Sequence, residues 1–538
     1  MPLALVVGVL LDPAPSAQSR PDLATLETRA ERSDYAETTP YDEVRAFLDT
    51  VDRASPRIHL TTFGYTTEGR ALPLAVVGQV SDARPETVRA SGKTRVYLQG
   101  NIHAGEVEGK ESLLAFLREI AQGQHAAWLE SMVLLVAPIY NADGNERVTL
   151  TNRGRQHGPI GGMGQRSNAR NFDLNRDHMK LDTPEARSLV RFMTAYDPHV
   201  AIDLHTTNGT RHAYHLTYSP PLNPNTDPQI VTLLRSDWLP RITKAIKDKH
   251  GWDFYYYGNV MAPGGGERGW YTFDHRPRFG NNYVGLRNRF AILSEAYSYA
   301  IFPERIAATS RFVEQILDSV HRSAAEVRRI TADLDARSVI GQQFALRARY
   351  HRSEPVDILM GDVAEERNPH SGHVMLRRLD VRKPERMPEF GTFEPTESQT
   401  APVRYFVPTE LGGVIERLQA HGVRMTRTDA SLTLKLQQFR IDSSTTAERA
   451  FEQHHERTVT GEYESVDKTV PAGTFVVRVD QPLGRLVFYL LEPRSDDGFV
   501  NWNVLDEALK GAKVYPILRE PGPRQPSSAG QPKPWNAR

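Results

Sequence analysis

The sequence contains no cysteine among its 538 residues. Disulfide bonds, thiolate nucleophiles and thiolate metal ligands are therefore excluded. Any metal site in this chain has to be built from histidine, aspartate and glutamate, and these ligands suit zinc or a harder cation.

A net charge of one sign is also absent, because 66 basic residues balance 66 acidic ones. Without an overall positive field, we expect neither a nucleic-acid partner nor an anionic-lipid partner. Charge recognition by this chain has to be local. The sequence does not indicate an oligomeric state.

Long hydrophobic runs are missing as well. The apolar run at residues 3–11 is too short to span a bilayer. It resembles the hydrophobic part of a signal peptide, with "PSA" before Gln18 as a cleavage site, although no basic residue precedes the run. We predict a signal peptide or N-terminal tail over residues 1–19. The expected location is secreted or periplasmic, with the cytoplasm as the alternative.

Residues 20–337 alternate between strand-like and helix-like segments. Four short apolar runs bounded by polar turns predict buried strands: "TRVYLQ", "MVLLVAPIY", "HVAIDL" and "RFAILS". The segment "TPEARSLVRFMTAY" predicts a helix with Thr183 as its N-cap and Pro184 at the first helical position. We predict an α/β domain with a mixed, largely parallel sheet sandwiched by helices.

The sequence changes character after Ser338. Residues 338–518 carry more strand-like alternation, as in "GTFVVRVD" and "GRLVFYLLE", and one helical piece, "ELGGVIERLQAHG". We predict a smaller β-rich accessory domain here, with a role in packing, folding or substrate docking. Residues 519–538 are rich in proline, serine and glycine, which predicts a disordered tail.

Polar side chains follow three of the predicted strands. His103 and Glu106 come after the first strand, His205 after the third and Glu295 after the fourth. Because ligands of open α/β sheets bind beyond the carboxyl ends of the strands, we expect these side chains to meet. Two histidines and a glutamate can hold zinc and leave a fourth position for water, and a further carboxylate can accept the proton of that water.

Each of these observations has an ordinary alternative when taken alone. The His103–Glu106 pair could belong to a polar surface turn, and Glu295 could form an ion pair with Arg287 or Arg289. We favour the metal interpretation because separate strand ends supply the complete set.

Four motifs occur in order between about residues 41 and 334: "HAGE", "DLNR", "DLH" and "LSEAYSY". With them the chain resembles the M14, or carboxypeptidase A-like, family of zinc metallocarboxypeptidases. The resemblance implies one zinc ion per chain and hydrolysis of the C-terminal bond of a peptide by a zinc-activated water. It implies that His103, Glu106 and His205 bind the metal and that Glu295 is the general base.

The resemblance also implies a substrate-binding pair. Asn175 and Arg176, in "NFDLNRD", would hold the free C-terminal carboxylate of the peptide. A guanidinium matches a carboxylate in two-pronged geometry. Asp173 would orient the first zinc histidine by accepting a hydrogen bond from it.

An arginine and a tyrosine complete the set that the resemblance implies. Arg153, in "TNRGRQHG", would stabilise the developing oxyanion, with Arg155 as the alternative. Tyr271 or Tyr283 would cover the substrate, and Tyr271 fits better by its separation from Glu295.

The segment before the general base would form the floor of the side-chain pocket. It contains no aspartate that would select a basic side chain. Its four arginines could favour an acidic side chain if one pointed inward, but we expect them to be solvated or paired with the sheet edge: Arg276, Arg278, Arg287 and Arg289. The long loop at residues 145–171 is expected to shape access to the site.

Two other functions stay open at this stage. The related amidohydrolases of N-acyl amino acids, such as succinylglutamate desuccinylase and aspartoacylase, share the same kind of ligand set. A non-catalytic binding protein that keeps the fold is the second alternative. The "DLNRD" segment and the long loop favour peptide cleavage.

Overall fold

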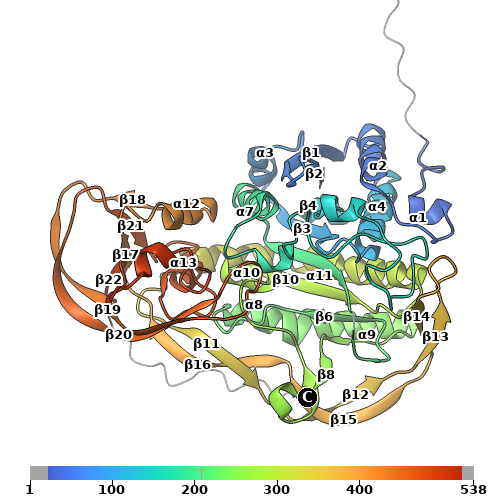
Figure 1. Cartoon of the computed structure of the whole chain (residues 1–538). Helices are drawn as coiled ribbons and strands as arrows, with labels where there is room; N and C mark the ends of the chain where they lie inside the picture. The colour runs from blue at the N-terminus through green and yellow to red at the C-terminus, as the bar shows by residue number, and fades with distance from the viewer. Residues whose placement is uncertain (1–21, 208, 524–538) are drawn as a thin grey trace, which may run out of the picture.

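The computed structural model describes residues 22–207 and 209–523. Its centre is an eight-stranded sheet with the strand order β1-β2-β4-β3-β5-β10-β6-β7 (Figure 1). The strands are β1 (Ile58–Tyr65), β2 (Ala71–Val77), β3 (Thr94–Gly100), β4 (Met132–Ala137), β5 (Val200–Thr206), β6 (Leu216–Ser219), β7 (Phe254–Tyr256) and β10 (Phe290–Ala296).

Four of the seven strand pairings in this sheet are parallel: β3 with β4, β3 with β5, β5 with β10, and β6 with β7. The other three are antiparallel. Every residue of β3 and β4 is buried, which explains their continuous apolar sequences. The predicted mixed, largely parallel sheet is confirmed.

Helices pack on both faces of the sheet, as Figure 1 shows. One face is covered by α2 (Tyr41–Ala54), α4 (Glu108–Ala121), α5 (Trp128–Ser131), α9 (Leu239–His250) and α11 (Phe302–Ala336). The other is covered by α3 (Pro85–Ala90), α7 (Pro184–Tyr196) and α10 (Gly280–Leu286). The hydroxyl of Thr183 caps α7 by accepting the amide of Ala186 at 3.1 Å, as predicted.

The region after Ser338 is rich in strands and curves beside the sandwich in Figure 1. A six-stranded sheet contains β17 (Arg404–Val407), β18 (Thr426–Arg427), β19 (Leu432–Thr446), β20 (Arg457–Val470), β21 (Phe475–Arg478) and β22 (Leu518–Glu520). Two antiparallel pairs are formed by β11 (Gln343–His351) with β16 (Thr392–Thr400), and by β13 (Val363–Arg367) with β14 (Val374–Arg378). The predicted helix is present as α12 (Gly412–Ala420).

This region shares a sheet with the sandwich. Strand β12 (Pro355–Met360) pairs with β15 (Lys383–Phe390), and β15 pairs in parallel with β9 (Gly269–Tyr271), which is bonded to β8 (Asn259–Met261). The C-terminal region therefore extends a sheet that begins before the predicted boundary at residue 338. The boundary itself stays a prediction.

One predicted strand is wrong. The segment "GRLVFYLLE" forms helix α13 (Gly484–Leu491), and all eight of its residues are buried. A short run of mainly apolar residues fits a buried strand as well as a buried helix, and the length and composition of this segment do not separate the two structures.

The predicted disordered tail begins too early, because Arg519 and Glu520 belong to β22. The rest of that tail from residue 524, and the predicted signal peptide, lie outside the described residues. Among the helices that the structure describes, none combines the length and the apolar character that crossing a bilayer needs.

Candidate active site

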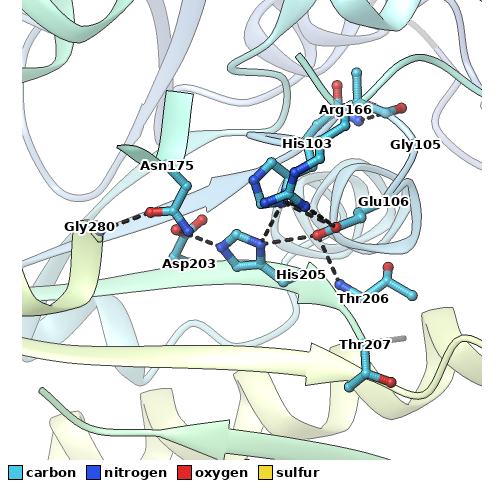
Figure 2. Close-up of polar contacts among 12 residues, drawn as sticks. His103, Gly105, Glu106, Arg166, Asn175, Asp203, His205, Thr206, Thr207 and Gly280 are labelled. Atoms are coloured by element: carbon cyan, nitrogen blue, oxygen red, sulfur yellow. Dashed lines mark hydrogen bonds and ion pairs between the residues drawn. The ribbon is translucent and has the colours of Figure 1, made fainter. Parts of the chain in front are cut away.

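His103, Glu106 and His205 converge at the carboxyl edge of the sheet. His103 and Glu106 lie in the turn between β3 and α4, and His205 lies in β5. The Nδ1 atom of His103 is 3.3 Å from that of His205, and the two atoms are 3.1 Å and 3.0 Å from the Glu106 carboxylate. Figure 2 shows both imidazoles turned toward Glu106. All three side chains are buried, so this group could hold a metal ion.

A carboxylate binds the second nitrogen of each histidine. Asp173 lies 3.0 Å from Nε2 of His103, and Asp203 lies 2.8 Å from Nε2 of His205. Such partners fix the ring and leave the other nitrogen free to bind a metal. The sequence analysis proposed Asp173 but missed Asp203, although Asp203 stands two residues before His205 in the strand "AIDLH".

The turn that carries His103 and Glu106 depends on Gly105. A Cβ atom at this position would lie 2.8 Å from Cδ of Arg153 and 2.9 Å from the carbonyl oxygen of Gly164. The turn closes with a 2.9 Å hydrogen bond from the Glu106 amide to the His103 carbonyl group. The glycine thus lets the loop at residues 145–171 pack directly against the metal-ligand turn.

Glu295 lies in β10 and lines the same cavity as the three candidate ligands. Its Oε2 atom is buried and has no hydrogen-bond partner within the described residues. Burial raises the pKa of Glu295 to about 8. A carboxyl group held in this way is suited to accept and return a proton near neutral pH.

The ordinary alternative for Glu295 was an ion pair with one of two arginines. In the structure, Arg287 donates to the Tyr283 hydroxyl and to the carbonyl oxygen of His421. Arg289 binds Asp197 and Asp335. Both guanidinium groups are thus committed elsewhere.

Asn175 and Arg176 form part of a short 3₁₀ turn and line the cavity. The Oδ1 atom of Asn175 accepts the amide of Gly280 at 2.9 Å (Figure 2). The guanidinium of Arg176 lies 3.8 Å from the ring centre of Phe279 and donates to the carbonyl oxygen of Asn175 at 2.7 Å. Asp173 caps the turn by accepting the Asn175 amide at 2.9 Å.

Arg153 also reaches the ligand group, but its donors are occupied. It binds Glu106 at 2.8 Å, Gln156 at 2.7 Å and two backbone carbonyl groups of the chain after His205. Only 11% of its side chain is exposed. Arg155, the predicted alternative, is exposed at the cavity rim.

Arg166 lines the cavity too, and the sequence analysis missed it. Its Nη1 atom lies 3.3 Å from Nδ1 of His103 and 3.7 Å from Glu106. Its other nitrogens bind Asp173. The side chain is 45% exposed, so a substrate could reach it. The sequence contained one indication that Arg166 could belong to the site, because Arg166 lies in the same loop as Arg153.

The two predicted tyrosines lie away from the lining of this cavity. The hydroxyl of Tyr271 donates to the Glu267 carbonyl group at 2.7 Å, and the Tyr283 hydroxyl bonds His421 at 2.9 Å. Among the described residues, the tyrosines that line the cavity are Tyr257 and Tyr299. The charge of Glu295 contributes, after burial, to raising the pKa of Tyr257.

The cavity that contains the site measures about 750 Å³. Its wall also includes Phe273, Phe279 and Leu293. The four arginines of the predicted pocket floor are absent from the described lining of the cavity. Each of them binds another group: Arg276 binds Asp274, Arg278 binds Asp497, and Arg287 and Arg289 bind the partners given above.

Part of the chain matches a model of a known protein family. Residues 44–260 match the family model described as zinc carboxypeptidase, peptidase M14. That range includes the three candidate metal ligands, and Glu295 lies beyond it.

Similar proteins come from several organisms. "Carboxypeptidase 2" of Trichophyton tonsurans is 26% identical over 478 residues, which cover 84% of this chain and 81% of that protein. "Carboxypeptidase E" of Caenorhabditis elegans is 32% identical over 148 residues, covering 26% of this chain and 29% of that protein. The crystal structure of a metallo-carboxypeptidase from Burkholderia cenocepacia aligns with a TM-score of 0.39 at 17% identity, covering 53% of this chain and 70% of that one.

The matched family model and the sandwich fold with its His-Glu-His group lead to one conclusion. Residues 44–260 form a zinc carboxypeptidase (peptidase M14) domain, and the chain is a hydrolase of the metallocarboxypeptidase type.

Proposed function

We propose that this enzyme removes residues from the C-terminus of peptides, with zinc held by His103, Glu106 and His205 and with Glu295 as the general base. The observation that carries the proposal is the arrangement of one cavity. The cavity is lined by a buried His-Glu-His group, by the Asn175–Arg176 turn and by Glu295, whose Oε2 atom has no hydrogen-bond partner in the described part of the chain.

The donor set fits a zinc ion. Two imidazole nitrogens and one carboxylate lie within 4.8 Å of one another, and the second nitrogen of each histidine is bonded to a carboxylate. Three protein ligands leave a coordination position open, as catalytic zinc sites do. A bound zinc ion would supply Lewis-acid chemistry, acidifying water and polarising the scissile carbonyl group.

Substrate binding is assigned to the 3₁₀ turn. Arg176 would hold the free carboxylate through charge-assisted hydrogen bonds, and Asn175 would donate its amide group. This pair places the last peptide bond at the reacting centre and makes the enzyme an exopeptidase. The guanidinium of Arg166 is a better candidate than that of Arg153 to stabilise the oxyanion, because 45% of the Arg166 side chain is exposed and only 11% of the Arg153 side chain is.

Glu295 carries the proton through the reaction. Its carboxylate accepts a proton from the attacking water while the water oxygen bonds to the carbonyl carbon. The same group then donates the proton to the amine nitrogen as the carbon–nitrogen bond breaks. The products are a free amino acid and a peptide that is one residue shorter.

The test compares three substrates by mass spectrometry. These are a peptide with a free C-terminus, the same peptide with a C-terminal amide, and an N-acetyl amino acid. We expect stepwise shortening of the free acid alone, loss of this activity after chelation, and recovery when zinc is added. Hydrolysis of the N-acetyl amino acid alone would instead assign the chain to the amidohydrolases. Equal cleavage of the amidated peptide would contradict an exopeptidase.

A further inference from the structure

The C-terminal region contacts the proposed carboxylate-binding turn directly. Strands β19 and β20 form a long hairpin whose tip spans residues 447–456. At this tip the carboxylate of Glu452 accepts the backbone amide of Asp173 at 2.9 Å. The hydrogen bond lies at the first residue of the turn that carries Asn175 and Arg176.

The tip holds Glu452 in an uncommon backbone conformation. The φ angles of Glu452 and Gln453 are 48° and 64°. Residues other than glycine adopt the left-handed region rarely, and they keep it where surrounding contacts fix the chain. Here Gln453 donates to the carbonyl oxygen of Arg170 at 3.1 Å, and His454 bonds Asp182 at 2.7 Å. The two residues that follow Glu452 therefore anchor the tip.

A second contact supports the other side of the same turn. Asn175 accepts the amide of Gly280, and Arg176 stacks on Phe279. These two partners, Phe279 and Gly280, directly follow Arg278 in the sequence. The backbone amide and Nε of Arg278 donate to the carboxylate of Asp497 at 2.6 Å and 2.7 Å.

The Asp497 contact is deep inside the protein. Asp497 is fully buried, and Arg278 is 2% exposed. Trp502 donates its indole N–H to the same carboxylate at 2.8 Å. Arg278 also binds Glu456, which belongs to the same hairpin tip as Glu452. Two carboxylates of the C-terminal region therefore hold backbone amides at this site, one at the start of the substrate-binding turn and one in the segment that its side chains contact.

We propose that the region after Ser338 completes the substrate-carboxylate half of the active site, with Glu452 and Asp497 as positioning residues. The inference rests on the role proposed above for Asn175 and Arg176. Glu452 fixes the start of their turn, and Asp497 fixes the loop on which their side chains rest. A preorganised turn binds a substrate carboxylate without first losing conformational freedom.

Glu452 is the residue to test, because it is only partly buried, whereas Asp497 lies in the core. In the full-length zinc-loaded enzyme, we compare Glu452→Ala with Glu452→Gln. The glutamine keeps an oxygen that can accept the Asp173 amide, and the alanine does not. Glu462→Ala is the control, since Glu462 is an exposed glutamate on the same hairpin.

We expect Glu452→Ala to raise KM for a peptide with a free C-terminus about tenfold, the effect of losing one hydrogen bond that orders the turn, while kcat stays within about twofold. The glutamine variant should stay within about threefold of wild-type KM, and the control should not change. Hydrogen exchange read by mass spectrometry should speed up at residues 173–176 in the alanine variant alone, with zinc content unchanged.

Three results would overturn the proposal. One is a wild-type KM together with wild-type exchange at residues 173–176 in Glu452→Ala. Another is equal impairment of the alanine and glutamine variants. The third is a parallel loss of kcat, zinc content and thermal stability, which indicates a general packing role. If the wild-type enzyme shortens no peptide, the proposed function fails, and the exchange measurement still decides whether Glu452 orders the turn.

Discussion

Glu295 and His205 occupy equivalent positions on the neighbouring parallel strands β10 and β5. Residues paired in this way project to the same face of a sheet. Strand pairing, and not a flexible loop, therefore sets the position of the proposed base relative to one of the proposed metal ligands. Sites built on strands hold catalytic groups more accurately than sites built on loops.

The first prediction concerns the base itself. Glu295→Gln should bind zinc as the wild type does but lose kcat by about a thousandfold or more, because an amide cannot carry the proton. Steady-state kinetics and zinc analysis on the same sample measure the two properties. Activity retained in this variant would move the role of base to another residue.

The second prediction concerns protons released on zinc binding. The pKa of Glu295 is raised to about 8, so at pH 7 the group is mainly protonated before metal binds. A nearby divalent cation favours the charged carboxylate and lowers this pKa, so zinc binding should expel the proton. Titration calorimetry at pH 7 in two buffers of different ionisation enthalpy should detect about one proton fewer for Glu295→Gln than for wild type. Equal proton counts for the two proteins would contradict a protonated Glu295 in the metal-free enzyme at pH 7.

The third prediction separates two arginines. Arg166→Ala should lower kcat/KM by about a hundredfold to a thousandfold with little change in zinc affinity, as expected for loss of an oxyanion donor. Arg153→Ala should mainly weaken zinc binding, because Arg153 holds the ligand Glu106 at 2.8 Å. Kinetics and chelator competition on both variants check this division, and the reverse pattern would return the oxyanion role to Arg153.

The fourth prediction concerns the carboxylate behind His205. Asp203→Asn should lower zinc affinity about tenfold to a hundredfold, because the second nitrogen of His205 loses a charged partner at 2.8 Å. Asp357→Asn, at an exposed aspartate on β12, serves as the control. The measurement is competition with a chelator of known affinity. Unchanged affinity in Asp203→Asn would show that the pair does not tune the metal site.

The central fold was predictable because its strands have a recognisable sequence pattern. The runs that end before His103, His205 and Glu295 are continuous and apolar, which is the pattern of strands buried on both faces. The same property misled the prediction at residues 484–491, where a short and mainly apolar buried segment forms a helix. Length and apolar content alone do not separate the two structures.

The parts of the site that the sequence did not reveal are those set by contacts between distant segments. Arg153 and Arg166 share a loop, and only its folded path decides which guanidinium stays accessible. The contact of Glu452 with Asp173 joins residues separated by 279 positions. Single-sequence patterns report local periodicity and give no information on such pairs.

The parallel pairing of β15 with β9 has a consequence for a cleaved chain. Backbone hydrogen bonds join these strands at Trp270–Glu389 and Tyr271–Phe390, on either side of the connection at residues 337–342. A nick in that connection would leave the two fragments bonded through a shared sheet and through the buried Arg278–Asp497 contact. Limited digestion there should give two bands on a denaturing gel and a single peak in gel filtration.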